Sequence, residues 1–365
     1  MAIELKLENK ANEDIRALLN QTILGTPGGI QYKLSNINDK IDTLENTQFL
    51  CLNLRGRTIG TIALSRRIFE HNNFHPLATD YIRYLSIKGL MRDENNHKSK
   101  RQNTSRKNNR TKALVSSFFE DSSKIKGDSI PSSSDYIMYA FVDSHNERSA
   151  NLVESNGFKP YRKFKTTAYN NFSCKKQTEV RRLADSNYKE QVREYLYNEY
   201  SEHSLYHPDL INLKEDYWIL EEDGQLIAGI KVRPTTWKIL NLPGIYGKFL
   251  LNYLPKISFF KRHMNPDEFR FLACEGIIVR DGHEQKLTKL IEGVCYEYKT
   301  SIAMFWFDTK SPLLQRLSKI KKMGILKRVL NFKPASLYVR SEKISSKTEQ
   351  LLKERPTYIS AYDIV

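Results

Sequence analysis

The sequence predicts an α/β protein that contains two copies of one domain. The first observation is length, because 365 residues suit two domains of about 150 to 200 residues each. The second is that both halves of the chain repeat one order of β-rich and helical segments. The third is a compact unit at 136–158, in which an unbroken apolar run precedes a short helix that closes on Gly157.

The first half begins with a hairpin. Residues 49–53 and 58–65 are rich in β-branched and apolar side chains, and they flank the turn dipeptide Arg55-Gly56. The elements expected after this hairpin are a strand over 79–87, a helix over 111–120 and a strand over 136–142.

The second half repeats this order. Its hairpin turns at Asp223-Gly224, between strands expected over 217–220 and 225–232. The elements expected next are a strand over 269–279, a helix over 284–299, a strand over 301–307 and a helix from about Pro312. A repeat this long indicates two domains rather than a solenoid, and we place them at 1–173 and 174–365.

The unit at 136–158 has the most specific pattern in the chain. Asp143 and Ser144 offer side-chain oxygens for a helix N-terminus, and Gly157 supplies the positive φ that ends a helix. Its spacing resembles motif B of the GNAT superfamily of N-acyltransferases, where Asn, Ser or Ala, Leu and Gly-Phe recur along one helix. The residues that match are Asn146, Ser149, Leu152, Gly157 and Phe158.

This resemblance implies a fold and a cofactor. Each copy would be a mixed, mostly antiparallel sheet flanked by helices, an α/β (α+β) arrangement in which two strands part to admit acetyl-CoA or another acyl-CoA. The helix with Asn146 and Ser149 would lie beside the pantetheine arm. One position departs from the family. Val153 stands where a Tyr commonly protonates the leaving thiolate, and Val has no proton to donate.

The coenzyme also needs free backbone groups on a strand and a loop that binds its phosphates. Leu85, Ser86 and Ile87 stand in the place of the family's Leu-x-Val, whose backbone pairs with the pantetheine amides. A later segment is similar to the family's phosphate-binding signature, in which glycines let the loop approach the pyrophosphate. The matching positions are Arg106, Asn109, Thr111 and Leu114, with Asn109 and Thr111 in the glycine positions.

The segment around that signature is strongly basic. Residues 88–112 hold nine Lys or Arg against two acids, a net charge of +7. Its middle, 93–105, has few apolar residues, so we expect it to be mobile and either to clamp the coenzyme's phosphates or to be a solvated insertion. Arg106, Arg110 and Lys112 are nearest the expected helix and are the stronger candidates for phosphate binding.

Two residues are candidates for proton transfer. Glu275 lies in an apolar strand where the family often places a Glu that takes a proton from the substrate amine, and burial raises a carboxylate's pKa. The alternative is a structural Glu that faces solvent or pairs with a Lys or Arg. Tyr161, or Tyr139 in the preceding strand, is placed to supply the proton that Val153 lacks, and each is equally a packed aromatic.

The second copy is expected to be degenerate. After the strand over 269–279 its sequence enters a helix directly and leaves little room for a phosphate loop. We therefore expect the first copy to hold the coenzyme and the second to shape the acceptor pocket or an interface.

The composition fits a soluble intracellular enzyme, and we expect it in the cytoplasm. No run approaches the roughly 20 apolar residues of a membrane span, and the N-terminus lacks an apolar signal segment. His203 and His207 stand four apart without a third ligand, so we expect no metal. Neither a metal spacing nor a disulfide framework connects the four cysteines, Cys51, Cys174, Cys274 and Cys295.

The net charge of +16 is concentrated in 88–112 and in 310–343. No zinc finger, helix-turn-helix or aromatic RNA-binding signature accompanies it, so we expect no nucleic-acid partner. Residues 237–263 mix apolar, aromatic and basic side chains without an acid. This amphipathic insertion is expected to pack on its own domain or a partner subunit, to rest on a membrane surface, or to accept a long acyl chain.

Together with these patterns, the resemblance to the GNAT superfamily implies acetyl transfer from acetyl-CoA to an amine by direct attack. The acceptor would be a small-molecule or peptide amine, and a backbone N–H near Ile87 would hold the oxyanion. Two alternatives stay open. One is a lipid or peptidoglycan-type acyl or aminoacyl transferase on the same fold, and the other is a catalytically inactive pair of domains that acts as a binding scaffold.

Overall fold

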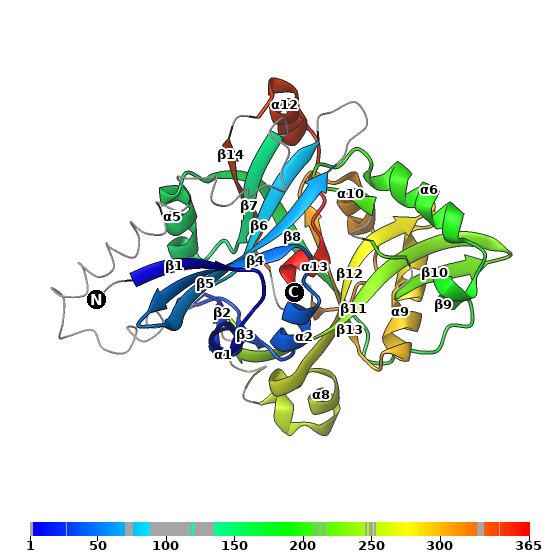
Figure 1. The fold of residues 1–365 in the computed structure, drawn as a ribbon. Coiled ribbons are helices and arrows are strands. Elements are labelled where there is room, and N and C mark those ends of the chain that lie inside the picture. The colour runs from blue at the N-terminus through cyan, green and yellow to red at the C-terminus, as the bar shows by residue number, and fades with distance from the viewer. Residues whose placement is uncertain are drawn as a thin grey trace.

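The structure is a computed structural model in which two lobes share one central sheet (Figure 1). It describes residues 3–26, 28–69, 76–87, 116, 119, 135–208, 211–213, 216–244, 247, 251, 253–326, 332–342 and 344–365. In this part of the chain, no helix is long and apolar enough to cross a membrane.

The described residues of the first half form one lobe of the sheet and the helices that cover it. Its strands are β1 (Ile3–Glu8), β2 (Leu24–Gly25), β3 (Gln31–Leu34), β4 (Thr47–Leu54), β5 (Arg57–Phe69), β6 (Leu77–Ile87), β7 (Asp135–Val142) and β8 (Lys159–Asn170). Its helices are α1 (Glu13–Gln21), α2 (Ile37–Asp42) and α5 (Glu147–Ser155). The expected helix over 111–120 lies outside the described residues, apart from Ser116 and Phe119.

The second half supplies the other lobe. Its strands are β9 (Val180–Arg182), β10 (Tyr217–Glu222), β11 (Gln225–Asn241), β12 (Phe269–Val279), β13 (Ile302–Asp308) and β14 (Ala335–Glu342). Its helices are α6 (Lys189–Tyr200), α8 (Ser258–His263), α9 (Leu287–Glu297), α10 (Pro312–Ser318), α12 (Ser346–Glu354) and α13 (Ala361–Ile364).

Both predicted hairpins form, and their turn residues explain why. Arg55 and Gly56 have φ of 53° and 73°, and Asp223 and Gly224 have φ of 50° and 70°. Two consecutive left-handed residues make the turn whose twist matches that of paired strands. The β4–β5 and β10–β11 pairs are therefore fixed locally by the sequence.

The strand order links the two halves. It runs β1-β4-β5-β6-β7-β14-β8-β13-β12-β11-β10-β9. β14, from the end of the chain, lies between β7 and β8 and is antiparallel to both. β8, from the first half, continues the sheet to β13. The proposed boundary after residue 173 separates two parts of the sequence. In the sheet, however, β14 of the second part lies among strands of the first, and β8 of the first part pairs with β13 of the second.

One expected boundary is wrong. The second strand of the later hairpin was expected to end near Val232, but β11 continues to Asn241. Residues 237–241 of the expected insertion are therefore part of a strand, in which buried Trp237 and Ile239 alternate with exposed side chains. Trp237 pairs with Phe269 of β12 on one side and with Leu34 of β3 on the other, so tertiary pairing extends the strand.

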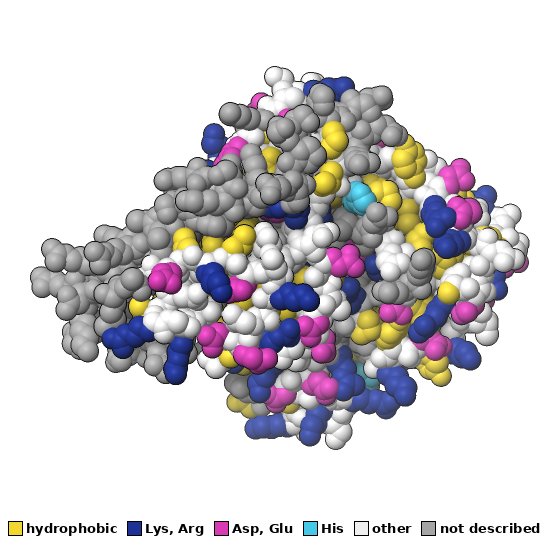
Figure 2. Space-filling model, in the orientation of Figure 1, with side chains coloured by type: hydrophobic (Ala, Val, Ile, Leu, Met, Phe, Trp, Pro, Cys, Tyr) yellow, Lys and Arg dark blue, Asp and Glu magenta, His cyan; other side chains and the backbone are white. Residues whose placement is uncertain are grey.

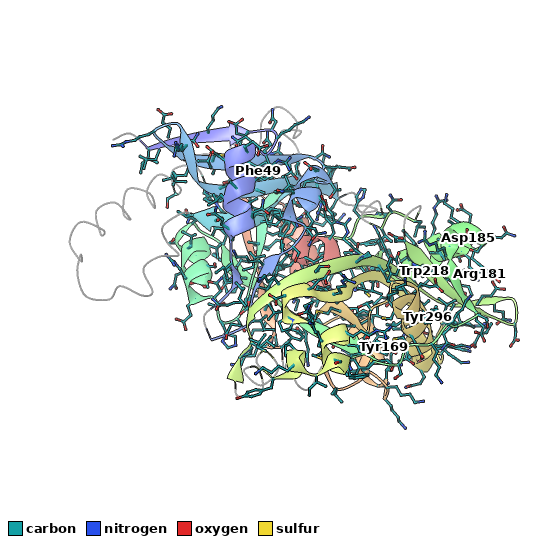
Figure 3. The ribbon with its side chains drawn as sticks, turned by 90° about the horizontal axis from the view of Figure 1, so that it is seen from below. Phe49, Tyr169, Arg181, Asp185, Trp218 and Tyr296 are labelled. Atoms are coloured by element: carbon teal, nitrogen blue, oxygen red, sulfur yellow. The ribbon has the colours of Figure 1, made fainter. Side chains whose placement is uncertain are left out.

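Alternation along the strands gives the first lobe a core on each face of its sheet. Phe49 and Cys51 of β4 pack with Ile15 of α1 and Ile41 of α2 on one face. Leu50, between them in sequence, belongs to the cluster with Val153 of α5 on the opposite face. Seen from below, Phe49 lies in this lobe, and Tyr169, Trp218 and Tyr296 lie in the other (Figure 3).

Candidate active site

β6 and β7 are parallel neighbours that pair along only part of their length. Their register runs from Leu77 opposite Asp135 to Ile82 opposite Ala140. β6 continues to Ile87 without a further pair to β7 in the described structure. The two strands therefore part after Ile82.

A bulge in β6 coincides with this parting. The register between β5 and β6 shifts between Thr61 and Ala63, and Tyr84 has a φ of 54°. A bulge bends its strand and removes backbone groups from the ladder. On the side that faces β7, residues 83–87 keep backbone N–H and C=O groups that β7 does not pair.

The three strand residues predicted to contact the coenzyme lie at this bend. Leu85 is half-buried and packs against the apolar cluster beneath α5. Ser86 is buried, and its hydroxyl lies 2.6 Å from the Thr22 hydroxyl at the end of α1. Ile87 is half-buried at the end of the strand. Their side chains serve packing, so any contact with a ligand would come from the backbone.

The helix predicted from motif B is α5. The Asn146 side chain caps it by accepting a hydrogen bond from Ser149 N at 2.9 Å, and both residues are half-buried. Gly157 follows the helix with a φ of 81°. Val153 is buried beneath the helix, so the position that commonly holds Tyr in the family is part of the core here.

The predicted phosphate loop lies outside the described residues. This applies to the segment 93–105 and to the individual candidates Arg106, Asn109, Arg110, Thr111 and Lys112.

The second lobe repeats the parting of two parallel strands. β12 and β13 pair only from Leu272 opposite Ala303 to Cys274 opposite Phe305. The register between β11 and β12 then shifts between Gly229 and Lys231, and Gly276 has a φ of 56°.

The two bulges place Arg83 and Glu275 at equivalent positions of the repeat. Each is the first residue after the last parallel pair, and each precedes a residue with positive φ. Each also has its antiparallel partner at the register shift, Ala63 opposite Arg83 and Lys231 opposite Glu275. The repeat inferred from the sequence is thus present in the register of the strands.

The carboxylate of Glu275 contacts side chains and backbone of other elements. Its Oε2 accepts hydrogen bonds from Ser360 Oγ at 2.8 Å and from Ala361 N at 3.1 Å, at the start of α13. Its Oε1 lies 3.9 Å from Lys231 Nζ. This arrangement favours the alternative of a structural Glu, and its role as a base stays a prediction.

The two tyrosines have different surroundings. The Tyr161 hydroxyl is buried and accepts or donates no hydrogen bond within the described residues, and burial raises its pKa to about 12. The Tyr139 hydroxyl accepts a hydrogen bond from Arg67 Nη1 at 3.0 Å, and burial raises its pKa as well. Both stay protonated near neutral pH, which a proton donor requires.

The C-terminal helix α13 contacts both strands with a bulge, although no sequence pattern indicated it. α13 lies at the centre of the molecule, between the two lobes (Figure 1). Arg67 donates to both Asp363 carboxylate oxygens at 2.7 and 2.5 Å, and the Tyr81 hydroxyl donates to the Asp363 carbonyl at 2.6 Å. β5 and β6 hold one part of this helix while Glu275 of β12 holds its start. No local pattern near residue 360 signals these contacts.

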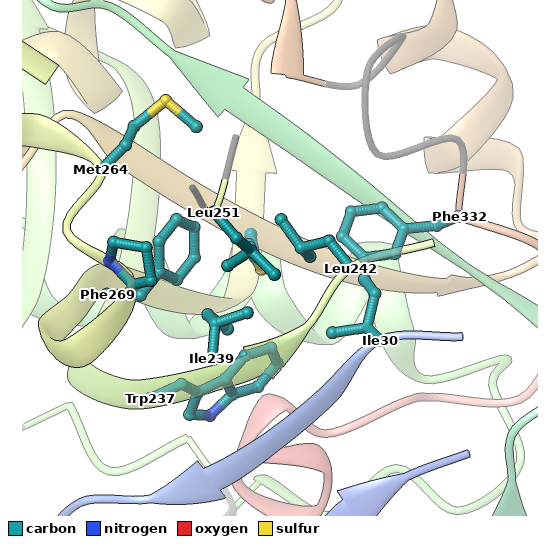
Figure 4. Close-up of a pocket in the computed structure, with 10 residues that line it drawn as sticks. Ile30, Trp237, Ile239, Leu242, Leu251, Met264, Phe269 and Phe332 are labelled. Carbon is teal, nitrogen blue, oxygen red and sulfur yellow. The ribbon is translucent and has the colours of Figure 1, made fainter. Parts of the chain in front are cut away.

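A small apolar pocket lies in the second lobe, beside the end of β11 (Figure 4). Its volume is about 30 Å³, roughly twice what one water molecule needs, so it does not hold a long acyl chain in this structure. Trp237, Ile239, Leu242 and Leu251, all from the expected insertion, line it. These side chains thus pack inside the protein, partly against the first half of the chain, where the Tyr32 ring of β3 stacks on Trp237 with centroids 3.9 Å apart.

A larger cavity of about 670 Å³ lies in the first lobe. Charged side chains from the ends of the strands line part of it, among them Arg66, Arg67 and Asp80. Within the described ranges, no three His, Cys, Asp or Glu side chains come together as a metal ion would require.

Known proteins resemble this chain in structure only. No protein-family model and no curated protein matches its sequence. The structure of Saccharomyces cerevisiae N-myristoyltransferase with bound myristoyl-CoA matches with a TM-score of 0.55 over 97% of this chain and 84% of that one, at 10% identity. The chain has the GNAT fold. The predicted α/β class and the tandem arrangement are therefore confirmed.

Two further solved structures also match. A tandem GNAT protein from the clavulanic acid biosynthesis pathway has a TM-score of 0.46 over 94% of this chain and 100% of that one, at 11% identity. A probable N-acyltransferase from Enterococcus faecalis has a TM-score of 0.49 over 93% of this chain and 73% of that one, at 9% identity.

Proposed function

We propose that this protein is an acyl-CoA-dependent N-acyltransferase whose coenzyme site lies between β6 and β7. The observation that carries this proposal is the parting of the two strands at the Tyr84 bulge, which leaves backbone groups of 83–87 without partners from β7. Such groups fit a pantetheine arm, because its amides need both donors and acceptors in an extended groove.

The residues of this chain have separable tasks in the reaction. Leu85, Ser86 and Ile87 bind the pantetheine amides through their backbone, and a backbone N–H near Ile87 stabilises the oxyanion. Asn146 fixes the start of α5 beside the same gap. The coenzyme supplies an activated acyl group, and the amine attacks that group directly. Tyr161 is a candidate proton donor because its buried hydroxyl carries a proton near neutral pH.

The donor is more narrowly proposed to be acetyl-CoA and the acceptor a small-molecule or peptide amine. The yeast enzyme of the same fold was crystallised with myristoyl-CoA, which supports a coenzyme A thioester as the class of donor.

A binding scaffold is the second candidate. Two observations favour it: Val153 is a buried core residue with no proton to donate, and Glu275 is already bonded to α13. A scaffold would bind the coenzyme or its partner without releasing thiol.

Two serines on α5 give a matched test of the site. Ser149 is half-buried next to the helix start, whereas Ser155 is exposed at its end. Calorimetry should detect binding of coenzyme A to the wild type and to the control variant Ser155→Trp. In Ser149→Trp the indole should fill the gap between β6 and β7 and reduce the affinity for coenzyme A at least tenfold, about 1.4 kcal/mol. Equal affinity in the two variants would remove the gap from the coenzyme's path.

Free thiol release separates the enzyme from the scaffold. Acetyl-CoA and longer acyl-CoA donors are supplied with a panel of amines, and the released thiol is measured. Release that depends on an amine supports the transferase, and the donor that is used fastest sets the acyl length. Binding without release for every donor and amine would leave the scaffold as the function.

A further inference from the structure

Three basic side chains from three elements meet at the junction of the lobes. Lys40 comes from α2, Arg83 from the bulge of β6 and Arg233 from β11. The Tyr362 ring of α13 lies near both arginines, with its centroid 5.4 Å from the Arg83 guanidinium carbon and 4.2 Å from that of Arg233. The Tyr362 hydroxyl donates to the Thr43 carbonyl at the end of α2, close to Lys40. We call Lys40, Arg83 and Arg233 the basic cluster.

Two members of the basic cluster are buried with unused donors. Lys40 is 5% exposed and Arg83 is 6% exposed. Lys40 Nζ makes no hydrogen bond in the described structure, and neither do Nε and Nη1 of Arg83. The remaining Arg83 nitrogen donates to the Tyr84 hydroxyl at 2.8 Å and to the Tyr362 carbonyl at 3.3 Å. Buried charged donors ordinarily have partners, so these atoms call for an acceptor.

The acids nearby are engaged elsewhere. Asp363 is the carboxylate whose charge acts on Arg83, and both of its oxygens already accept hydrogen bonds from Arg67. Glu275 is occupied by α13 and Lys231. Burial, followed by the charges of Arg83 and Arg233, lowers the pKa of Lys40 to about 7. The cluster thus has more positive charge than the described acids compensate. Basic side chains on the face in Figure 2, by contrast, are interspersed with acidic ones.

The cluster lies on the acceptor's side of the proposed reaction. Arg83 and Tyr81 are two apart in β6 and share one face of the sheet, the face that α13 covers. Ile82 belongs to the cluster beneath α5 on the opposite face, where the coenzyme is proposed to lie. Arg83 is also the first residue after the strands part. An anion held here would sit next to the reacting centre but across the sheet from the coenzyme's helix.

We propose that the basic cluster binds an oxyanion of the acceptor, so that the substrate is an amine that also carries a carboxylate or phosphate group. This inference rests on the proposed function and names the acceptor class for that site. Nε and Nη1 of Arg83 are unused donors on different edges of the guanidinium, so each offers one hydrogen bond, and Lys40 Nζ adds a further charged donor. Arg233, Tyr84 and Tyr362 are half-buried and mark the side from which solvent reaches the cluster.

Anion binding is tested first, without coenzyme or turnover. Sodium acetate and sodium phosphate are titrated separately into the full chain at pH 7, by calorimetry in two buffers of different ionisation enthalpy. Both anions should bind. Acetate, which is fully ionised at pH 7, should bind with net uptake of protons, because a bound negative charge raises the pKa of Lys40 above 7. Lys40→Met should abolish this uptake and weaken binding about tenfold or more, while Lys319→Met, which removes an exposed charge, should match the wild type.

A stability measurement distinguishes a ligand site from a structural one. Without ligand, Lys40→Met should unfold at the same or a higher urea concentration, because it replaces an unpaired buried amine with an apolar chain. Arg233→Met, at the half-buried edge, is the second variant and should also weaken anion binding. Absence of heat with both anions in the wild type, or equal binding by wild type and both variants, would overturn the proposal.

Turnover then identifies the oxyanion. The acceptors are ethanolamine, which is an amine without an acidic group, glycine, which adds a carboxylate, and phosphoethanolamine, which adds a phosphate. Their KM values are compared in the thiol-release assay. Either glycine or phosphoethanolamine should have a KM at least tenfold below that of ethanolamine. In the Lys40→Met variant, the KM values of these acceptors should become equal. Equal KM values for all three would overturn the acceptor assignment while the transferase stands. Anion binding without any thiol release would keep the site and remove the proposed function.

Discussion

The pair of Arg67 and Asp363 should be the most sensitive link between the lobes. Arg67 comes from β5, and Asp363 comes from α13 at the centre of the molecule. Their side chains are 14% and 3% exposed, and the guanidinium holds both carboxylate oxygens. Asp363→Asn keeps the shape of the side chain but removes its charge, so the buried Arg67 loses its counter-ion.

The expected loss is large compared with the stability of a folded domain. Removing one partner of a buried pair costs about 3 to 5 kcal/mol, because the other charge stays buried without compensation. Total stabilities are of order 5 to 15 kcal/mol. With a urea dependence of about 3 kcal/mol per molar, the midpoint of unfolding should fall by roughly 1 M or more.

Equilibrium unfolding in urea, followed by circular dichroism, measures this loss. The control is Asp42→Asn, which breaks the pair of Arg16 and Asp42, whose side chains are 24% and 60% exposed. An exposed pair contributes at most about 1 kcal/mol, so the control should stay close to the wild type. The double variant Arg67→Met with Asp363→Leu should recover most of the loss, because it removes both charges. If Asp363→Asn and Asp42→Asn unfold alike, Arg67 is not buried as the structure has it.

Two other predictions concern acid stability and surfaces. Burial lowers the pKa of His203 to about 4, so the folded state binds fewer protons than the unfolded state from pH 6.5 down to 4, and stability falls across that window by about 3 kcal/mol. His203→Gln should remove this part of the loss in urea unfolding at pH 7 and pH 4.5, and His207→Gln should retain it. Ile257 and Phe259, next to basic side chains around α8, are 50% and 48% exposed, so the protein should float with anionic liposomes at low salt. Serine at both positions should abolish flotation, whereas Ile325→Ser should not, and a wild type that stays at the bottom of the gradient contradicts a lipid-binding surface.

The elements that could be predicted from the sequence are those whose conformation is determined by neighbouring residues. Arg55-Gly56 and Asp223-Gly224 adopt the left-handed turns that fix both hairpins. Asn146 caps α5 as motif B requires, and Gly157 ends it. Each turn and each helix end depends on residues within a few positions of each other, so the sequence alone is enough to predict it.

The missed features depend on pairs far apart in the sequence. β14 pairs Leu337 with Phe141 of β7, and no spacing near residue 337 indicates this partner. Asp363 meets Arg67 across almost 300 positions. The basic cluster was missed for the same reason, since Lys40, Arg83 and Arg233 lie in three segments, each with an unremarkable charge pattern. The phosphate loop and its candidates stay predictions.

The two bulges differ in the surroundings of the side chain at their equivalent position. Glu275 and Arg83 occupy equivalent positions, but the acid is saturated by Ser360, Ala361 and Lys231, whereas the base keeps donors without acceptors. The start of α13 donates both hydrogen bonds that Glu275 Oε2 accepts in the second copy. In the first copy, α13 gives Arg83 one hydrogen-bond acceptor, the Tyr362 carbonyl, among the described residues. The chain itself thus satisfies the acid in the second copy, whereas in the first copy the proposed oxyanion would satisfy the remaining donors of Arg83.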